Sequence, residues 1–145
     1  SWSLAQKSWI ESDYPKTSSI SGTIYDVAKA KWGGKWRIAT QNEFQELISA
    51  CIWTWEERNG YYGYKVTGPS GNSIFLPTTG YRRGFSWYNS DKGYYWTGTM
   101  RSSTSPYPYV LNFDKANKGL NTTSVSGLAY PFKNYGCAIR PVQDK

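Results

Sequence analysis

The chain has 145 residues, 39% hydrophobic and 19% charged, a composition typical of one globular domain folded around a single core. It contains no histidine and two cysteines, which excludes catalytic triads, Cys-His pairs and metal sites built from histidine or from four cysteines. Its net charge of +7 is the excess of 17 basic over 10 acidic residues, and the scatter of the basic residues along the sequence favours a solvated surface over a nucleic-acid-binding stripe.

Two helices are expected in the first third of the chain. In TIYDVAKAKWGG the apolar residues recur at helical spacing before a Gly-Gly stop. The members of this first apolar face are Ile24, Val27, Ala28 and Trp32. KWRI is a short strand-like step, and in TQNEFQELISAC the residues Thr40 and Glu43 have the spacing of a capping box. The second apolar face comprises Phe44, Leu47, Ile48 and Cys51.

The hydrophobic period then changes from that of a helix to that of a strand. CIWTWEE, an Asn59-Gly60 turn, YYGYKVTG, a PSGN turn and SIFLP predict a three-stranded antiparallel meander. After Pro77, loops rich in Gly, Ser, Tyr and Asn contain three further strand candidates, YYWTGT, YPYVLNFD and YGCAIRPV. The sequence therefore predicts an α+β fold, with two helices packed on small antiparallel sheets and a long loop-rich C-terminal half. We expect a single domain over 1–145 that belongs to a longer protein, with an irregular lead-in over 1–20.

Several blocks, in this order, resemble a known bacterial family. They are YDVAKAKWGGKWRIATQNEFQEL, CIWTWEERNGYYGYKVTGPSGNSIFLP, GYRRG, GYYWTGT, YVLNFD and YGCAIRPV, and they span about residues 20 to 142. The family has a C-type lectin-like fold and is similar to the formylglycine-generating enzyme domain, the Fibrobacter-type paralogous domain and the variable proteins of diversity-generating retroelements. This resemblance implies that the last strand, with its RPV motif, returns beside the first part of the domain.

The resemblance also implies a display scaffold without catalytic residues. In retroelement targets, adenine-containing codons of the C-terminal part are rewritten while a hydrophobic frame stays fixed, and residues 80–138 would be that variable region. We expect the diversified tip of a bacterial surface or fimbrial adhesin, with a phage tail receptor-binding protein as the alternative. Either would be extracellular, on a bacterial cell surface or a virion, and would bind an unknown macromolecular ligand, a protein or a glycan, with multivalent display raising avidity.

Alternation along YVLNFD separates a core face from an open face. Tyr109, Leu111 and Phe113 form the first, and Val110, Asn112 and Asp114 the second. Aromatic residues in periodic settings are expected in the core. They are Trp32, Trp36, Phe44, Trp53, Trp55, Phe75, Tyr95, Trp96 and Phe113.

The remaining aromatic residues lie among Gly, Pro, Ser and Asn, a composition typical of antibody paratopes. The predicted ligand-binding residues are Arg83, Phe85, Trp87, Tyr88, Asn89, Tyr94, Arg101, Tyr107, Val110, Asn112, Asp114, Asn117, Tyr130, Phe132 and Tyr135. Changes at the adenines of an asparagine codon cannot produce Trp, so Trp87 is either a frame residue or the product of another template codon.

Three alternatives concern the cysteines, metals and nucleic acid. Cys51 and Cys137 would form a disulfide worth about 4 kcal/mol if the chain is exported, although the resemblance places Cys137 at a variable position. A formylglycine-type copper oxidase would need closely placed cysteines, and calcium-dependent binding would need a ligand motif that is missing, so we expect no catalytic residue, metal or cofactor.

Stacked rings and positive charge would also suit single-stranded nucleic acid, but we do not expect that partner. We expect no membrane insertion, since no apolar run approaches about 18 residues.

Overall fold

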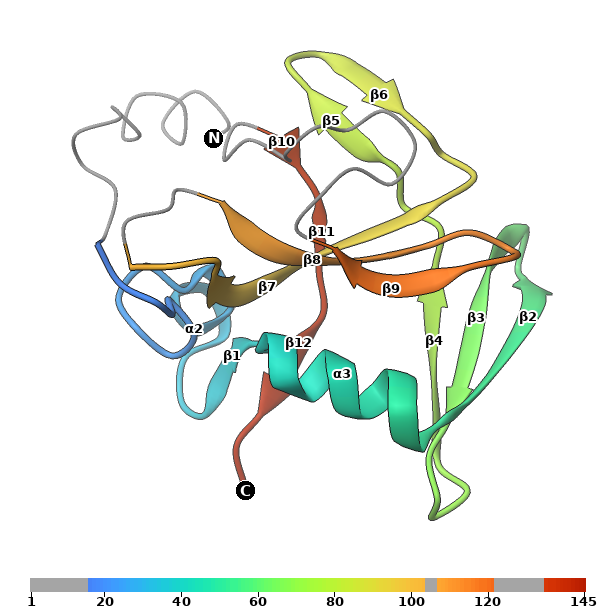
Figure 1. Cartoon of the computed structure of the whole chain (residues 1–145), viewed down its shortest axis with the longest axis horizontal. Helices are drawn as coiled ribbons and strands as arrows, with labels where there is room; N and C mark the ends of the chain where they lie inside the picture. The colour runs from blue at the N-terminus through green and yellow to red at the C-terminus, as the bar shows by residue number, and fades with distance from the viewer. Residues whose placement is uncertain (1–15, 104–106, 122–134) are drawn as a thin grey trace.

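The computed structural model describes residues 16–103, 107–121 and 135–145, and over these residues the fold is α+β and rich in short strands (Figure 1). Helix α2 (Val27–Trp32) ends at Gly33, as expected. Helix α3 (Gln41–Ala50) begins with a reciprocal capping box between Thr40 and Glu43, which confirms that prediction. Of the expected lead-in, residues 16–20 are described, and Ser19 forms a β-bridge with Thr99.

The predicted apolar face of the first helix is wrong. Of its members only Ala28 is buried, whereas Ile24, Val27 and Trp32 are exposed. The helix is instead held by the fully buried carboxylate of Asp26, which accepts hydrogen bonds from the backbone N–H groups of Ala28 and Lys29 in its first turn. The same carboxylate accepts N–H groups from Gly22 and Ile38, so a polar anchor replaces the expected apolar contact.

The predicted meander is confirmed. Strands β2 (Ile52–Arg58), β3 (Tyr61–Thr67) and β4 (Ser73–Pro77) pair antiparallel in sequence order. Asn59 and Gly60 both have positive φ angles, 54° and 83°, as the two-residue turn of a tight hairpin requires. In Figure 1 this sheet stands at the right of the molecule, with its β3–β4 turn pointing away from the rest.

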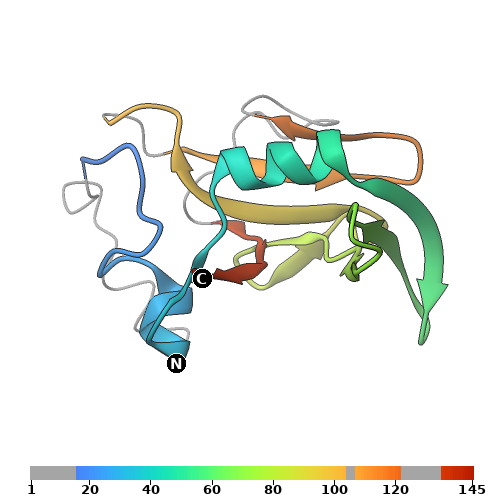
Figure 2. The same cartoon turned by 90° about the horizontal axis from the view of Figure 1, so that it is seen from below.

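A central sheet has the strand order β11-β7-β8-β9. Its strands are β7 (Gly93–Met100), β8 (Pro108–Phe113), β9 (Lys118–Asn121) and β11 (Ala138–Ile139), of which β11 runs parallel to β7. Helix α3 packs across β7, β8 and β9 (Figure 2). Strand β1 (Trp36–Ile38) pairs antiparallel with β12 (Pro141–Gln143), which confirms that the RPV segment returns beside the first part of the domain.

A third small sheet was not predicted. Strands β5 (Tyr81–Arg83) and β6 (Ser86–Tyr88) form a hairpin, and β10 (Tyr135–Gly136) pairs with the other edge of β5. Gly84 opens the two-residue turn at a φ of 59°, a conformation that favours glycine. This β5–β6 hairpin lies over one face of the central sheet and projects at the top of Figure 1.

Two hydrophobic clusters lie on opposite faces of the central sheet. Neighbouring residues of β7 point to opposite faces, and Tyr95 belongs to the first cluster while Tyr94 belongs to the second. The first cluster joins α3 and the meander, and its buried residues are Ala39, Phe44, Tyr64, Val66, Leu76, Tyr95, Leu111 and Phe113. The second cluster consists of Tyr81, Tyr94 and Val110, with Trp96 and Cys137 packed against it.

The prediction that Val110 and Asn112 lie on an open face of the sheet is wrong, because the second cluster covers that face. Val110, Asn112 and Tyr94 are buried because residues of β5 and of the segment before β11 cover the side of the sheet that was expected to meet solvent. The prediction that Trp32 lies in the core is also wrong. Trp32 is 59% exposed, and its ring centroid lies 5.9 Å from that of Trp36.

The possible disulfide does not form, and both cysteines are free. Cys51 caps α3 and packs against the first cluster, whereas Cys137 packs against the second. The central sheet therefore separates them, and a disulfide requires Cα atoms within about 7 Å of each other.

Candidate functional site

A groove runs between the tip of the meander and the β5–β6 hairpin. It consists of two adjoining hollows, of about 690 Å³ and about 430 Å³, which share Tyr61, Thr78 and Trp87 in their linings. The meander contributes Arg58 and Phe75 to the first hollow. The hairpin side contributes Gly80 and Arg82. Residues 136–138, where β10 ends and β11 begins, also line this hollow. The second hollow is lined by Trp55, Gly60, Tyr62, Ser90 and Asp91 in addition to the shared residues.

Trp87 is the most firmly held exposed ring of the groove. Its side chain is 58% exposed, yet its Nε1–H donates a hydrogen bond of 2.8 Å to the Thr79 carbonyl. The Arg82 guanidinium lies 5.0 Å from the ring centroid, within range for a cation–π contact. A Cβ atom added at Gly80, whose φ is 57°, would overlap the indole, so glycine is required beneath Trp87. The ring is therefore presented to solvent in one orientation.

The opposite wall repeats the pairing of a guanidinium with a ring. Arg58 lies 4.8 Å from the centroid of Phe75, and it also forms an ion pair of 2.6 Å with Glu56. Beside this pair, Tyr61 is 64% exposed at the meander tip, and Tyr62 stacks at 6.4 Å on Trp55. This wall thus offers flat ring surfaces, and the charge of its guanidinium group is compensated by a carboxylate.

Most backbone groups of residues 77–80, which form the floor of the groove, are already hydrogen-bonded. The Pro77 carbonyl accepts the Tyr95 hydroxyl at 2.8 Å, and burial raises the pKa of Tyr95, so that hydroxyl stays protonated. The Thr78 N–H donates to Tyr62, and the N–H groups of Thr79 and Gly80 both donate to the Lys92 carbonyl. A ligand in the groove would therefore be recognised by side chains rather than by this backbone.

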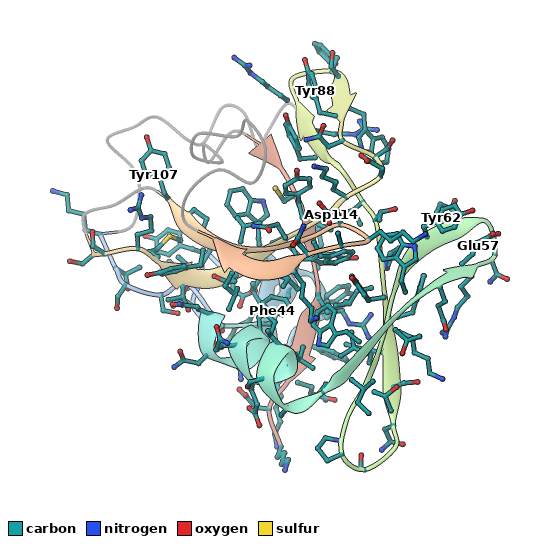
Figure 3. The ribbon with its side chains drawn as sticks, turned by 45° about the vertical axis from the view of Figure 1, so that its right-hand side comes forward. Phe44, Glu57, Tyr62, Tyr88, Tyr107 and Asp114 are labelled. Carbon is teal, nitrogen blue, oxygen red and sulfur yellow. The ribbon has the colours of Figure 1, made fainter. Side chains whose placement is uncertain are left out.

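Part of the predicted binding set lies at the groove and part does not. Trp87 lines it, and Arg83, Phe85, Tyr88 and Asn89 are exposed on or just after the same hairpin, with Phe85 97% exposed at its turn. Tyr88 stacks on Tyr81 with ring centroids 5.3 Å apart. Figure 3 shows Tyr88 on the hairpin and Tyr62 at the meander tip.

Other predicted residues are elsewhere. Tyr94, Val110 and Asn112 are buried, and Asn89 donates a hydrogen bond to the Tyr94 hydroxyl at 3.1 Å. Arg101 and Tyr107 lie together beyond the Met100 end of β7, where the Arg101 N–H donates to the Tyr107 carbonyl, and Figure 3 shows Tyr107 far from Tyr62.

Two predicted residues, Asp114 and Asn117, lie in a turn. Asp114 accepts the N–H groups of Ala116 and Asn117 in the β8–β9 turn. Of the last three predicted residues, Tyr130 and Phe132 fall outside the described residues, and Tyr135 pairs with Arg83 through the backbone.

Sequence reasoning missed the meander side of the groove. Tyr61 and Tyr62 directly follow the predicted Asn59-Gly60 turn, so their place at a hairpin tip was a usable signal. Trp55 and Phe75 were expected in the core, but each is only partly buried and lines the groove. Arg82 was missed because GYRRGFSWY was not interpreted as a hairpin, in which Arg82 is the cross-strand partner of Trp87.

The cysteines offer no pair for catalysis. Burial raises the pKa of the Cys137 thiol to about 12, so the thiol is protonated at neutral pH and is a weak nucleophile and metal ligand. Cys51 lies beyond the central sheet, and a formylglycine-type oxidase needs two closely placed thiols. Among the described residues, no three His, Cys, Asp or Glu side chains gather as metal ligands. No helix in the described part of the chain is long and apolar enough to cross a membrane.

Comparisons with protein-family models, with curated proteins and with solved structures found no match for this chain. The functional argument therefore depends on the groove itself.

Proposed function

We propose that the chain is a non-catalytic ligand-binding display domain and that the groove, with the rings beside it, is its binding surface. The observation that carries the proposal is Trp87, a large ring that is mostly exposed although a hydrogen bond, a guanidinium and a required glycine hold it still. Exposed apolar surface costs solvation free energy, and a gathering of such surface in a hollow is typical of an interaction site.

The domain would belong to the C-type lectin-like proteins and serve as the diversified tip of a bacterial surface or fimbrial adhesin, with a phage tail receptor-binding protein as the alternative. Three features support this proposal: the pairing of β1 with β12, the packing of α3 on the central sheet, and the exposed rings of the β5–β6 hairpin within the expected variable region. The ligand would be a macromolecule at a cell surface.

Recognition would use a rigid frame. The meander and the β5–β6 hairpin form the two walls, and the largely hydrogen-bonded floor leaves the rings and guanidinium groups as the contact groups. Because the Trp87 ring is already oriented, binding loses little side-chain entropy there. Rings of this kind are the usual energetic centre of an interface, and multivalent display would raise a modest single-copy affinity.

The test is binding of the labelled domain to a panel of bacterial and animal cells, comparing Trp87→Ala with Trp32→Ala. These two tryptophans are 58% and 59% exposed, so the second variant is a matched control away from the groove. We expect Trp87→Ala to weaken binding at least about tenfold, because truncating an aromatic residue at the centre of an interface costs about 2 kcal/mol or more, and Trp32→Ala to leave it unchanged. Equal effects of both variants would contradict the proposal.

Two further arms of this experiment separate other modes of binding. Cell binding should survive a calcium chelator, because no calcium-ligand motif is found in the sequence. It should weaken only mildly between about 50 and 200 mM salt, whereas a nucleic-acid groove that neutralises 6 to 10 phosphates would lose roughly 10³ to 10⁵ in affinity. Tight and steeply salt-dependent binding of oligo-dT would overturn the display-domain proposal.

A further inference from the structure

Arg82 brings a positive charge to the groove. Arg58, on the opposite wall, is neutralised by Glu56 at 2.6 Å. Within the described residues, no carboxylate lies at ion-pair distance from Arg82, whose guanidinium instead lies over the Trp87 ring. The ring leaves the planar fork of the guanidinium available, and that fork matches a carboxylate geometrically. The first hollow therefore suits a ligand that carries an anionic group.

The second hollow has a different character. Ser90 and Asp91 add a hydroxyl and a carboxylate to its lining, and both residues are exposed. A carboxylate accepts hydrogen bonds from hydroxyl groups, and a serine hydroxyl both donates and accepts them. Tyr61 and Trp87, one from each wall, border both hollows. A ligand that spans the groove would thus meet a cation, two rings and then hydroxyl-binding groups.

This order of groups fits an acidic sugar better than a peptide strand. An extended peptide binds a strand edge through backbone N–H and C=O groups, but along residues 77–80 all three N–H groups and the carbonyls of Pro77, Thr79 and Gly80 are already bonded within the domain. A pyranose ring needs no backbone partner. It presents a face of C–H groups to aromatic rings and hydroxyls around its edge, and a uronate or sialate adds one carboxylate.

We propose that the groove binds a carboxylate-bearing saccharide, with its carboxylate at Arg82, its ring faces against Trp87 and Tyr61, and its hydroxyls toward Ser90 and Asp91. This inference rests on the proposed function and specifies the class of ligand. The carboxylate could come from a uronic acid of a polysaccharide or from a terminal sialic acid of a glycan, which share this chemistry.

The experiment is a calorimetric titration of the domain with four probes: tetragalacturonate, its carboxyl-reduced neutral counterpart, sialyllactose and lactose. We expect one acidic probe or both to bind in a calcium-independent way, and each neutral counterpart to bind at least about tenfold more weakly, because hydrogen bonds to a charged group contribute about 1.5 to 3 kcal/mol. Which acidic probe binds identifies the source of the carboxylate.

Matched variants locate the binding in the groove. Arg82→Gln should weaken the acidic probe about tenfold and leave the neutral one unchanged, while Lys29→Gln removes the same charge from the exposed side of α2 and should change neither. Trp87→Ala should weaken both probes, and Trp32→Ala neither. Thermal melts of all four variants verify that each remains folded.

Each contrary result has a separate meaning. If neither acidic probe binds at millimolar concentration while cell binding is still lost in Trp87→Ala, the saccharide inference is overturned and the proposed function stands. If acidic and neutral probes bind equally, or if Arg82→Gln has no effect on the acidic one, the carboxylate does not bind at Arg82 and the inference is likewise overturned. If cell binding is also indifferent to Trp87→Ala, the proposed function fails as well.

Discussion

Single polar residues organise the part of the fold that apolar periodicity failed to describe. Asp26 is fully buried and accepts four backbone N–H groups, two from its own helix and one each from Gly22 and Ile38. A carboxylate with several N–H donors satisfies its own hydrogen-bonding capacity and that of the chain around it. Its effect is to fix α2 beside β1 while the apolar residues of α2 remain at the surface.

The ion pair between Glu43 and Arg37 should make stability depend on pH. Arg37 donates two hydrogen bonds to Glu43, at 2.7 and 2.8 Å, and a third of 2.8 Å to Asp144. The hydrogen bonds from Arg37, assisted by the Thr40 backbone, lower the pKa of Glu43 to about 2 against the opposing effect of burial.

Since the pKa of an unfolded Glu is about 4.3, the charged form stabilises the folded state above that pH. The contribution is lost as the pH falls toward about 2. We expect wild type to exceed Glu43→Gln by about 1 kcal/mol in unfolding free energy at pH 7, because the site is partly exposed. Urea titrations from pH 7 to pH 2 should show this difference shrinking to zero, and a difference that stays constant with pH would contradict the assignment.

At the scale of elements, local signals were sufficient for some parts and not for others. The capping box of α3 and the Asn59-Gly60 turn depend on residues within a few positions of each other, and both predictions are confirmed. The prediction that one face of β8 is open was wrong. The residues that bury Val110 are Tyr81 of β5 and Cys137, which are distant from it in the sequence. Alternation gives the faces of a strand, but the cover of each face depends on tertiary structure.

The exposed side chains of the β5–β6 hairpin should be energetically separate from the core. Trp53 donates its Nε1–H to Leu47 at 2.8 Å and packs edge-on against Tyr64 and Phe113. Tyr88 is exposed, and its stacking on Tyr81 is its main contact. We therefore expect Trp53→Ala to lower the unfolding free energy by about 3 to 5 kcal/mol, as for core aromatic truncations.

For Tyr88→Ala we expect a loss of only about 0.5 to 1.5 kcal/mol, the value of one aromatic pair. Thermal or urea denaturation of both variants provides the comparison. Similar large losses would mean that the hairpin belongs to the cooperative core, and the hairpin would then be a structural element before it is a binding surface.

At the scale of the whole molecule, the groove could not be predicted because three distant segments build it. The meander tip, the hairpin that follows Thr79 and residues 136–138 meet only in the folded chain. The sequence indicated the hairpin side, where Phe85, Trp87 and Tyr88 stand among small polar residues. It did not indicate that Arg58 and Phe75 on the meander would face them, since that depends on how two sheets pack.

The last strand should hold this arrangement together. β12 pairs with β1, Val142 packs against the first cluster, and Asp144 contacts Arg37. The strand directly follows β11 and the groove wall at 136–138, so its loss would release that wall. We expect deletion of residues 141–145 to lower the unfolding free energy by about 3 kcal/mol or more, as for other losses of packing and paired hydrogen bonds together, and to weaken cell binding.

Deletion of residues 144–145 alone removes the exposed ion pair but leaves β12, and should cost no more than about 1 kcal/mol without affecting binding. Urea denaturation and the cell-binding assay on both truncations decide the matter, and equal behaviour of the two would show that β12 does not support the groove.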